Sequence, residues 1–139
     1  MKLLGDFVLV IVLIVPAACA EEKDSDPISE GDELSGSWIL VEHGYSPGRG
    51  YIVEEVPEKP AQIITLTAGK ITTTMVGFKQ LTHYEVLTDS TTNTPYMAFH
   101  SSDPNQESQN FSFSLTKTEL KLYFRWCIEG CHLAFRKLE

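Results

Sequence analysis

The chain has 139 residues, of which 42% are hydrophobic and 22% are charged, and its formal net charge at pH 7 is −8. Most of this charge lies in residues 21–34, which contain seven acidic residues and one lysine, whereas residues 35–139 contain eleven acidic and nine basic residues. The net charge of residues 35–139 is therefore only −2, and they contain no basic patch with interleaved aromatic residues. We therefore expect no nucleic-acid binding.

Residues 1–18 have the order of parts of a secretory signal peptide. Lys2 supplies a positive charge, residues 7–15 form a nine-residue apolar run, and small residues follow Pro16. A membrane-spanning helix needs about 20 apolar residues, so this run is too short to be one. The segment therefore predicts export from the cytoplasm.

Two cleavage sites are open for this signal. The stretch PAAC, which ends at Cys19, resembles a bacterial lipobox, in which the cysteine becomes the lipidated first residue of the mature protein. Ala18, Cys19 and Ala20 also form a small-x-small site, and cleavage after Ala20 would release a soluble secreted protein. We favour lipidation, and hence an anchor in the bacterial outer membrane or cell surface, because it gives the odd third cysteine a function.

Residues 19–34 are predicted to be an acidic, flexible tether. Besides the acidic residues they contain two serines, a proline and a glycine, and few apolar residues. Such a segment buries too little apolar surface to offset the entropy that is lost when a chain becomes ordered. The remaining residues, 35–139, are predicted to form one folded domain.

The pattern of residues 35–139 is that of an all-β domain. In residues 111–115 phenylalanine alternates with serine, and in residues 120–126 four apolar side chains, the last of them Trp126, alternate with polar or aromatic ones. A period of two with one polar face is typical of a half-buried strand. The predicted strands are residues 37–43, 62–67, 70–76, 82–88, 96–100, 110–115, 120–126 and 132–137.

Eight sequential strands with mostly short connections predict an up-and-down antiparallel β-barrel, because closure removes the exposed edges of the sheet. A two-sheet sandwich is the alternative, because periodicity alone does not give the strand order. In the barrel, the connections 44–61, 77–81, 101–109 and 127–131 would lie at one end and form its mouth. The tether would enter at the opposite end, so that the mouth points away from the membrane.

A G-x-W motif, an arginine in the last strand and a stretch near the end of the chain carry a resemblance to a known family. Gly36, Ser37 and Trp38 open the first predicted strand and resemble the G-x-W motif of lipocalins. Arg136, in the last strand, resembles the lipocalin arginine that packs on that tryptophan at the closed end of the barrel. The stretch CIEGC is similar to the end of many secreted lipoproteins of Bacteroidetes type. The resemblance covers residues 34–139 and implies a lipocalin-like barrel that binds a small hydrophobic molecule.

Cys127 and Cys131 are predicted to form a disulfide. They flank three residues that read as a turn, with Gly130 available for a left-handed backbone conformation. Outside the cytoplasm such a disulfide persists. A c-type haem requires C-x-x-C-H, which is one residue shorter than the spacing here, and zinc would need two further ligands. We therefore expect no cofactor and no metal.

No motif predicts catalysis, and we do not expect an enzyme. Residues 44–48 match G-x-S-x-G nominally, but this motif uses the backbone N–H of the residue after the serine in its oxyanion hole. That residue is Pro47, which has no N–H. The stretch therefore reads as a turn.

The predicted function is that of a monomeric, membrane-tethered binding protein for a small hydrophobic molecule. The side chains expected to line the ligand site are Tyr45, Tyr51, Phe113, Phe124 and Trp126. For the apolar residues of the long connection 44–61, the alternative is that they only anchor the connection to the barrel. The alternative function is a filled barrel that binds another protein through the connections at its mouth.

Overall fold

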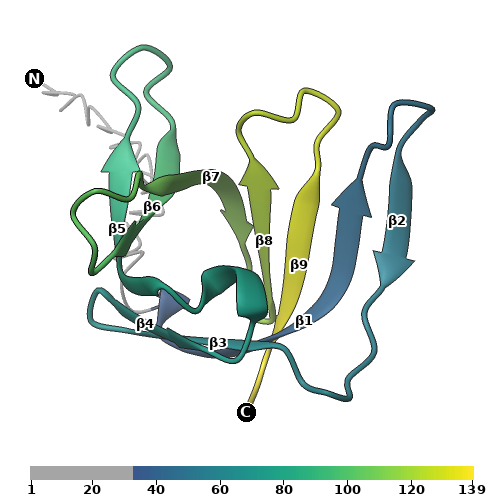
Figure 1. The fold of residues 1–139 in the computed structure, drawn as a ribbon, viewed down its shortest axis with the longest axis horizontal. Coiled ribbons are helices and arrows are strands. Elements are labelled where there is room, and N and C mark those ends of the chain that lie inside the picture. Colours follow the sequence, from purple (N-terminus) through teal and green to yellow (C-terminus); the bar gives the residue numbers. More distant parts are fainter. Residues whose placement is uncertain (1–32) are drawn as a thin grey trace, which may run out of the picture.

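The structure is a computed structural model that describes residues 33–139; the predicted signal peptide, Cys19 and nearly all of the tether lie outside the described residues. These residues form nine β-strands and one short 3₁₀ helix, η1 (Figure 1). The elements are β1 (Gly36–Tyr45), β2 (Ile52–Glu55), β3 (Ile63–Thr67), β4 (Lys70–Thr73), η1 (Val76–Phe78), β5 (Leu81–Thr88), β6 (Pro95–Ser101), β7 (Gln109–Leu115), β8 (Glu119–Phe124) and β9 (His132–Lys137). No helical segment within residues 33–139 has the length and hydropathy of a membrane-spanning helix.

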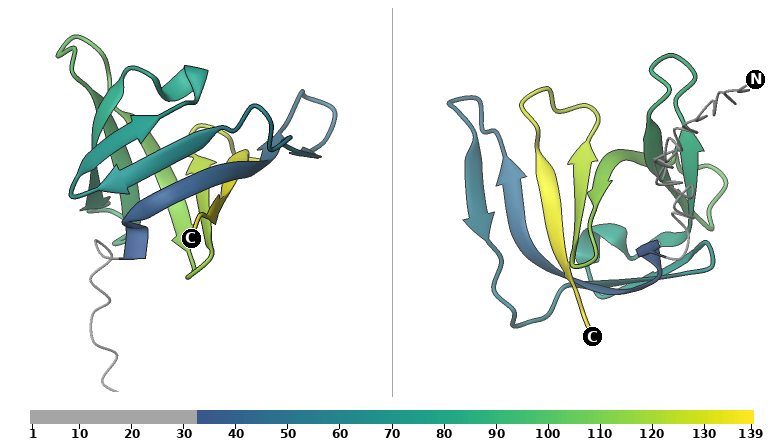
Figure 2. Two further views of the ribbon diagram at one scale, coloured as in Figure 1. Left: turned by 90° about the horizontal axis from the view of Figure 1, so that it is seen from below. Right: turned by 180° about the vertical axis from the view of Figure 1, so that it is seen from behind.

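Eight of the strands close into an antiparallel barrel in sequential order. Each strand from β3 to β9 pairs with the next one along the chain, and β1 pairs with both β3 and β9. Figure 2 shows the strands curving round into a ring. The predicted up-and-down barrel is therefore confirmed, and the sandwich is excluded.

The ninth strand, β2, lies within the connection 44–61 and was not predicted. It pairs with the second half of β1, from Glu42 opposite Glu55 to Tyr45 opposite Ile52, whereas the first half of β1 pairs with β3. The β1–β2 hairpin therefore extends the sheet beyond the ring (Figure 1). All four residues of β2 are exposed, so the alternation of buried and exposed residues that marks the other strands is missing here.

The predicted strand 70–76 ends early, at Thr73. The hydroxyl of Thr73 donates a hydrogen bond to the carbonyl of Ile63 at 2.9 Å and accepts one from the backbone N–H of Met75 at 2.9 Å. Threonine side chains compete in this way with the hydrogen bonds of a β-ladder. The chain leaves the sheet at this point, and η1 follows.

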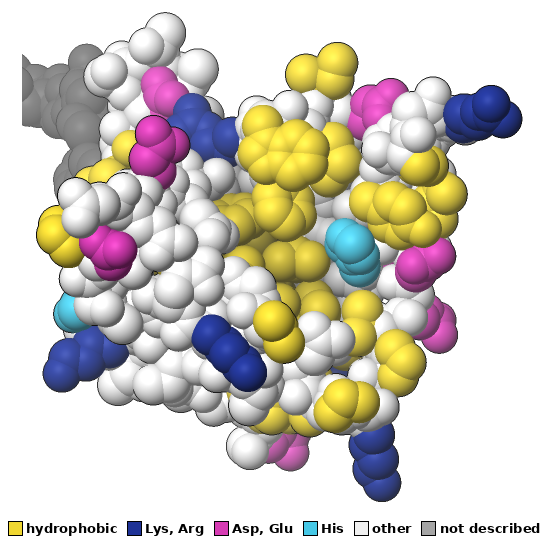
Figure 3. Space-filling model, in the orientation of Figure 1, with side chains coloured by type: hydrophobic (Ala, Val, Ile, Leu, Met, Phe, Trp, Pro, Cys, Tyr) yellow, Lys and Arg dark blue, Asp and Glu magenta, His cyan; other side chains and the backbone are white. Residues whose placement is uncertain are grey.

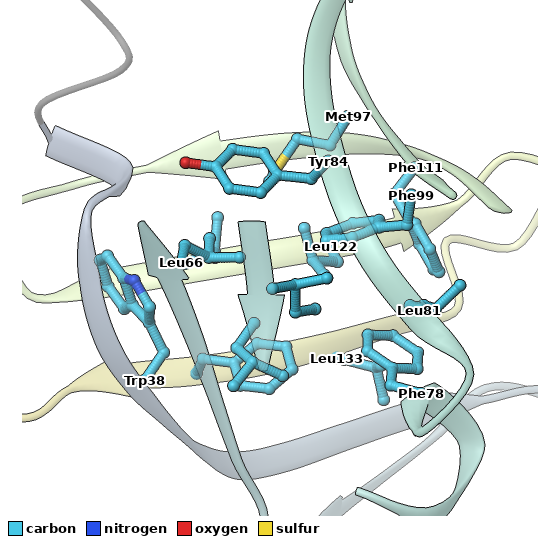
Figure 4. Packing of buried hydrophobic residues seen from close by; sticks show 14 of the residues in the cluster. Trp38, Leu66, Phe78, Leu81, Tyr84, Met97, Phe99, Phe111, Leu122 and Leu133 are labelled. Carbon is cyan, nitrogen blue, oxygen red and sulfur yellow. The ribbon is translucent and has the colours of Figure 1, made fainter. Parts of the chain in front are cut away.

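Inward-facing side chains fill the barrel. The largest fully buried ones are Trp38, Phe99, Phe111, Phe135, Leu34, Ile64, Leu66, Met97, Leu120 and Leu122. Figure 4 shows the cluster from close by, with Trp38 at one end and Phe78 and Leu133 at the other. Phe78, from η1, is 5% exposed, and its ring centroid lies 5.9 Å from those of both Phe99 and Phe111. The side chain of η1 thus packs into the barrel from the end opposite Trp38.

The closed end of the barrel holds Trp38, as the resemblance implied, but the cation beside it is not Arg136. The indole N–H of Trp38 donates to the carbonyl of Leu34 at 2.9 Å, and the Lys137 ammonium lies 5.0 Å from the indole centroid. Trp38 and Lys137 are direct partners in the β1–β9 ladder, so they share a face. Arg136 points to the opposite face, where it pairs with Glu58 at 2.7 Å, and the expectation that it packs on Trp38 is wrong.

Candidate functional site at the barrel mouth

The mouth of the barrel is the end formed by the β1–β2 hairpin, η1 and the connections β6–β7 and β8–β9. The hydroxyl of Tyr51, beside β2, donates to the carbonyl of Gly130 in the β8–β9 connection at 3.0 Å. Phe78 of η1 contacts Phe111 at the start of β7. Segments far apart in the sequence therefore meet at this end, opposite the end where the chain enters at Leu34.

A cavity of about 230 Å³ opens at the mouth between β7 and the end of β8. Its lining residues are Ser108, Gln109, Asn110, Phe111, Phe124 and Trp126. Phe111 is 1% exposed and forms the base of the cavity, whereas Trp126 is 77% exposed and forms its outer edge. The rings of Phe111 and Phe124 lie 5.1 Å apart and those of Phe124 and Trp126 lie 5.4 Å apart, so an aromatic row leads from the core to the surface.

Exposed apolar side chains gather around the same end. Of the seven large apolar side chains that are exposed within residues 33–139, six belong to the mouth and one, Leu138, does not. The six are Tyr51, Ile52, Val53, Val76, Trp126 and Ile128. Figure 3 shows apolar side chains both around and inside a hollow on this face of the molecule.

The five residues predicted to line a ligand site do not lie together. Phe124 and Trp126 both line the cavity, and Phe113 is partly buried against the core. Trp126 was expected on the inward face of a strand, but β8 ends at Phe124 and Trp126 lies in the connection that follows. Tyr45 stacks on His43 at 5.1 Å and donates to Glu54 at 3.0 Å, and this hydrogen bond to a carboxylate raises the pKa of Tyr45. Tyr51 does not line the cavity either, and its hydroxyl bonds to Gly130 in the β8–β9 connection.

Tyr51 belongs to a hydrogen-bonded cluster with His132 and Glu42 that no sequence pattern predicted. His132 is 6% exposed; its Nε2 bonds to the Glu42 carboxylate at 2.7 Å, and its Nδ1 shares a hydrogen bond with the Tyr51 hydroxyl. Burial and the nearby Glu42 carboxylate raise the pKa of Tyr51. The Tyr51 side chain therefore anchors the β1–β2 hairpin to β9.

Gly44 makes the close approach of this cluster possible. A Cβ at Gly44 would overlap the Tyr51 hydroxyl and lie 2.5 Å from Nδ1 of His132. A glycine within a strand often marks such a contact. The predicted strand 37–43 ended before Gly44, which read as part of a turn, whereas β1 continues to Tyr45. The three side chains themselves come from distant positions, so their meeting is a result of the fold.

The predicted disulfide between Cys127 and Cys131 is confirmed, with a Cα–Cα distance of 5.6 Å. Gly130 has a φ of 85°, the left-handed conformation that was expected. The cysteines are not opposed in the ladder, because β8 ends at Phe124 and β9 begins at His132. They lie within the connection, where the N–H of Cys127 donates to the carbonyl of Phe124 at 3.1 Å. The disulfide therefore holds a turn at the mouth.

Comparison with protein-family models, with curated protein sequences and with solved structures finds no match to the chain. The closed eight-stranded barrel is compatible with a lipocalin-like fold. Within residues 33–139 no group of three or more histidine, cysteine, aspartate or glutamate side chains is placed to hold a metal ion. The aromatic cavity and the exposed apolar side chains of the mouth are the candidate site that we develop below.

Proposed function

We propose that the protein is a monomeric, extracytoplasmic binding protein of lipocalin-like fold, which holds a small hydrophobic molecule at the mouth of its barrel. The observation that carries this proposal is the position of the exposed apolar side chains, since six of the seven within residues 33–139 belong to segments that form the mouth. Exposed apolar side chains that concentrate on one part of a protein commonly mark an interaction site. A ligand that covers these side chains would gain about 25 cal/mol for each Å² of apolar surface removed from water.

The filled interior supports a ligand that lies at the mouth and not in the centre of the barrel. Phe78, Phe99 and Phe111 pack against one another behind the cavity, and their rings fill the interior of the barrel there. The cavity of about 230 Å³ is below the roughly 300–1,000 Å³ of a typical small-molecule site. It therefore suits a small molecule, or one end of a longer molecule that lies across the exposed apolar residues.

Native mass spectrometry of the full chain, exported through an oxidising compartment and never delipidated, tests the proposal. We expect a discrete added mass that is lost on denaturation. Trp126→Ala should lose this mass and still fold, because the side chain is 77% exposed, whereas Leu138→Ala, far from the mouth, should keep it. An added mass that both variants retain would place the ligand elsewhere and overturn the proposal.

The alternative function is an interaction protein that binds another protein through the mouth. The filled interior is the observation that favours it, because a barrel without a central cavity need not enclose a ligand. A bare protein mass in the experiment above, together with capture of one protein that Trp126→Ala fails to capture, would support this alternative over the first.

For the location of the protein, we propose a lipid anchor at Cys19. The disulfide supports export to an oxidising compartment. Glu33 and Leu34 lie at the closed end, where their carbonyl groups accept hydrogen bonds from Lys137 and Trp38, so a tether from this end leaves the mouth free. Metabolic labelling with a fatty-acid analogue should mark the protein but not Cys19→Ala; a mature chain that begins at Glu21 would instead support soluble secretion.

A further inference from the structure

We propose that the mouth selects ligands with an uncharged, hydroxyl-bearing head group over ligands with an anionic head group. The inference rests on the binding function proposed above and names the class of molecule that the same site takes. Its basis is the division of the cavity into two chemical halves. One half is aromatic, and the other consists of Ser108, Gln109 and Asn110.

The aromatic half suits the apolar part of a ligand. Phe111, Phe124 and Trp126 follow one another with ring centroids 5.1 and 5.4 Å apart, and their exposure rises from 1% at Phe111 to 77% at Trp126. Aromatic side chains bury a large apolar area at a small cost in side-chain entropy. An alkyl chain or apolar ring laid along this row would cover Phe124 and Trp126 and end against Phe111.

The polar half offers hydrogen bonds without charge. The two amides each have donors and an acceptor, and the serine hydroxyl has both. Ser108 and Asn110 are exposed and Gln109 is half-buried, so a ligand can reach their polar groups. Gln109 shares the inward face of β7 with Phe111, whereas Asn110 lies on the outer face at the rim of the cavity. Hydroxyl groups also donate and accept, and therefore match these side chains in both senses.

The charges around the cavity disfavour an anion. The β6–β7 connection, residues 102–108, carries Asp103 and Glu107 and no lysine or arginine. Arg125, next to Trp126, is already paired with Asp89 at 2.6 Å and lies 4.7 Å from the ring centroid of Tyr96. A carboxylate placed at the cavity would lose hydration without gaining a counter-charge, which is unfavourable.

The test compares two amphiphiles that share an eight-carbon chain: octyl glucoside and octanoate, each below its micelle concentration and at neutral pH. Binding to the full chain is followed by tryptophan fluorescence, because Trp126 is exposed and Trp38 is fully buried. The variant Trp126→Phe keeps an aromatic ring and identifies the signal. We expect octyl glucoside to bind at least about tenfold more tightly, since two or three neutral hydrogen bonds together reach the roughly 1.4 kcal/mol of a tenfold difference.

A second variant tests the origin of the selectivity. Gln109→Lys, at a position that shares the inward face of β7 with Phe111, places a cation beside the cavity and should move the preference towards octanoate. Lys117→Asn, in the β7–β8 connection at the other end of the barrel, should leave it unchanged. Equal or tighter binding of octanoate by the wild-type chain overturns this inference and leaves the proposed binding function intact. Absence of binding by both amphiphiles, with the fold retained, overturns both. Octyltrimethylammonium that binds more tightly than octyl glucoside would show that the acidic connection selects the head group, and would also overturn the inference.

Discussion

The hydroxyl of Tyr51 and Nδ1 of His132 share a hydrogen bond across 81 residues of sequence, directly above the backbone of Gly44. The same hydroxyl donates to the carbonyl of Gly130 at 3.0 Å, and His132 bonds to Glu42 through its other ring nitrogen. Three segments therefore meet at one point beside the mouth: the β1–β2 hairpin, the disulfide-bonded connection and β9. The geometry of the mouth depends on this cluster.

Gly44→Ala should destabilise the protein, although replacing a strand glycine by alanine is ordinarily favourable. The new Cβ would overlap the Tyr51 hydroxyl and crowd the His132 ring, and relief of such a clash typically costs about 1–3 kcal/mol. Gly77→Ala is the matched control, because a Cβ at Gly77 meets nothing within 4 Å. Urea unfolding of both variants checks the prediction, and equal stabilities would mean that the Tyr51 side chain does not lie over Gly44.

Tyr51→Phe should loosen the β1–β2 hairpin without unfolding the barrel. The variant loses the hydrogen bonds to Gly130 and His132, at a cost of about 1–2 kcal/mol. Tyr45→Phe is the control, since that hydroxyl bonds only to the exposed Glu54 within the same hairpin. Amide hydrogen exchange in β2 should accelerate in Tyr51→Phe and remain at the wild-type rate in Tyr45→Phe. Similar exchange in both variants would contradict an anchoring role for Tyr51.

The cation that supports the closed end can be identified by substitution. Lys137→Met should lower the free energy of unfolding by about 1 kcal/mol, because it removes the contact with the Trp38 ring and the hydrogen bond to the carbonyl of Glu33. Arg136→Met removes only an exposed ion pair with Glu58 and should cost about 0.5 kcal/mol or less. Denaturant unfolding followed by Trp38 fluorescence measures both, and a larger loss in Arg136→Met would restore the role that the lipocalin resemblance implies.

The apolar pattern was sufficient to predict the barrel, because each of its eight strands carries side chains that are buried in the core. This pattern did not predict a strand that is exposed on both faces, or the point at which a strand ends although apolar residues continue to alternate. β2 is exposed at every residue and so has no apolar period to detect. The pattern in 120–126 continues to Trp126 after the chain has already turned, since the N–H of Cys127 bonds back to Phe124.

The interactions between side chains could not be predicted, because they depend on register. Lys137 and Arg136 differ by one position, and only the pairing of Lys137 with Trp38 across the β1–β9 ladder decides which of them meets the indole. The cluster of Glu42, Tyr51 and His132 requires the closure of the barrel as well as the β1–β2 hairpin. In the cavity, Phe124 and Trp126 were predicted as lining residues from the sequence. Ser108 and Gln109 lie in the predicted mouth connection 101–109 and Asn110 begins the predicted strand 110–115, but nothing in the sequence pattern marked them as lining residues.

Removal of the disulfide should weaken the mouth and leave the barrel intact. Cys127 and Cys131 are four positions apart, and closure of so short a loop contributes about 2 kcal/mol at most through the entropy of the unfolded chain. The barrel itself is closed by the β8–β9 and β1–β9 ladders. The disulfide lies within the β8–β9 connection and does not link two strands. The double variant Cys127→Ala/Cys131→Ala should therefore retain the far-ultraviolet circular dichroism spectrum but show faster exchange of the Gly130 amide. Loss of the β-sheet signal would assign the disulfide a role in the whole fold.

Asp89 should make stability depend on pH in the acid range. Its carboxylate bonds to Arg125 at 2.6 Å and accepts the backbone N–H groups of Thr91 and Thr92, and these interactions lower its pKa from 3.8 to about 2. The unfolded chain binds a proton at this residue more readily than the folded one, so the stabilisation is complete above about pH 4 and is lost as the pH falls towards 2. The difference in free energy of unfolding between the wild type and Asp89→Asn should therefore shrink across this interval.

Urea unfolding at several pH values between about 5 and about 2 measures this difference directly. Asp103→Asn is the control, because this substitution also removes one surface carboxylate. The Asp103 carboxylate accepts hydrogen bonds only from Asn105, within the β6–β7 connection. A gap between the wild type and Asp89→Asn that stays constant as the pH falls would show that Asp89 is not held ionised by Arg125. In that case Arg125 would be free to receive an anionic ligand beside Trp126, and the preference for an uncharged head group would lose one of its supports.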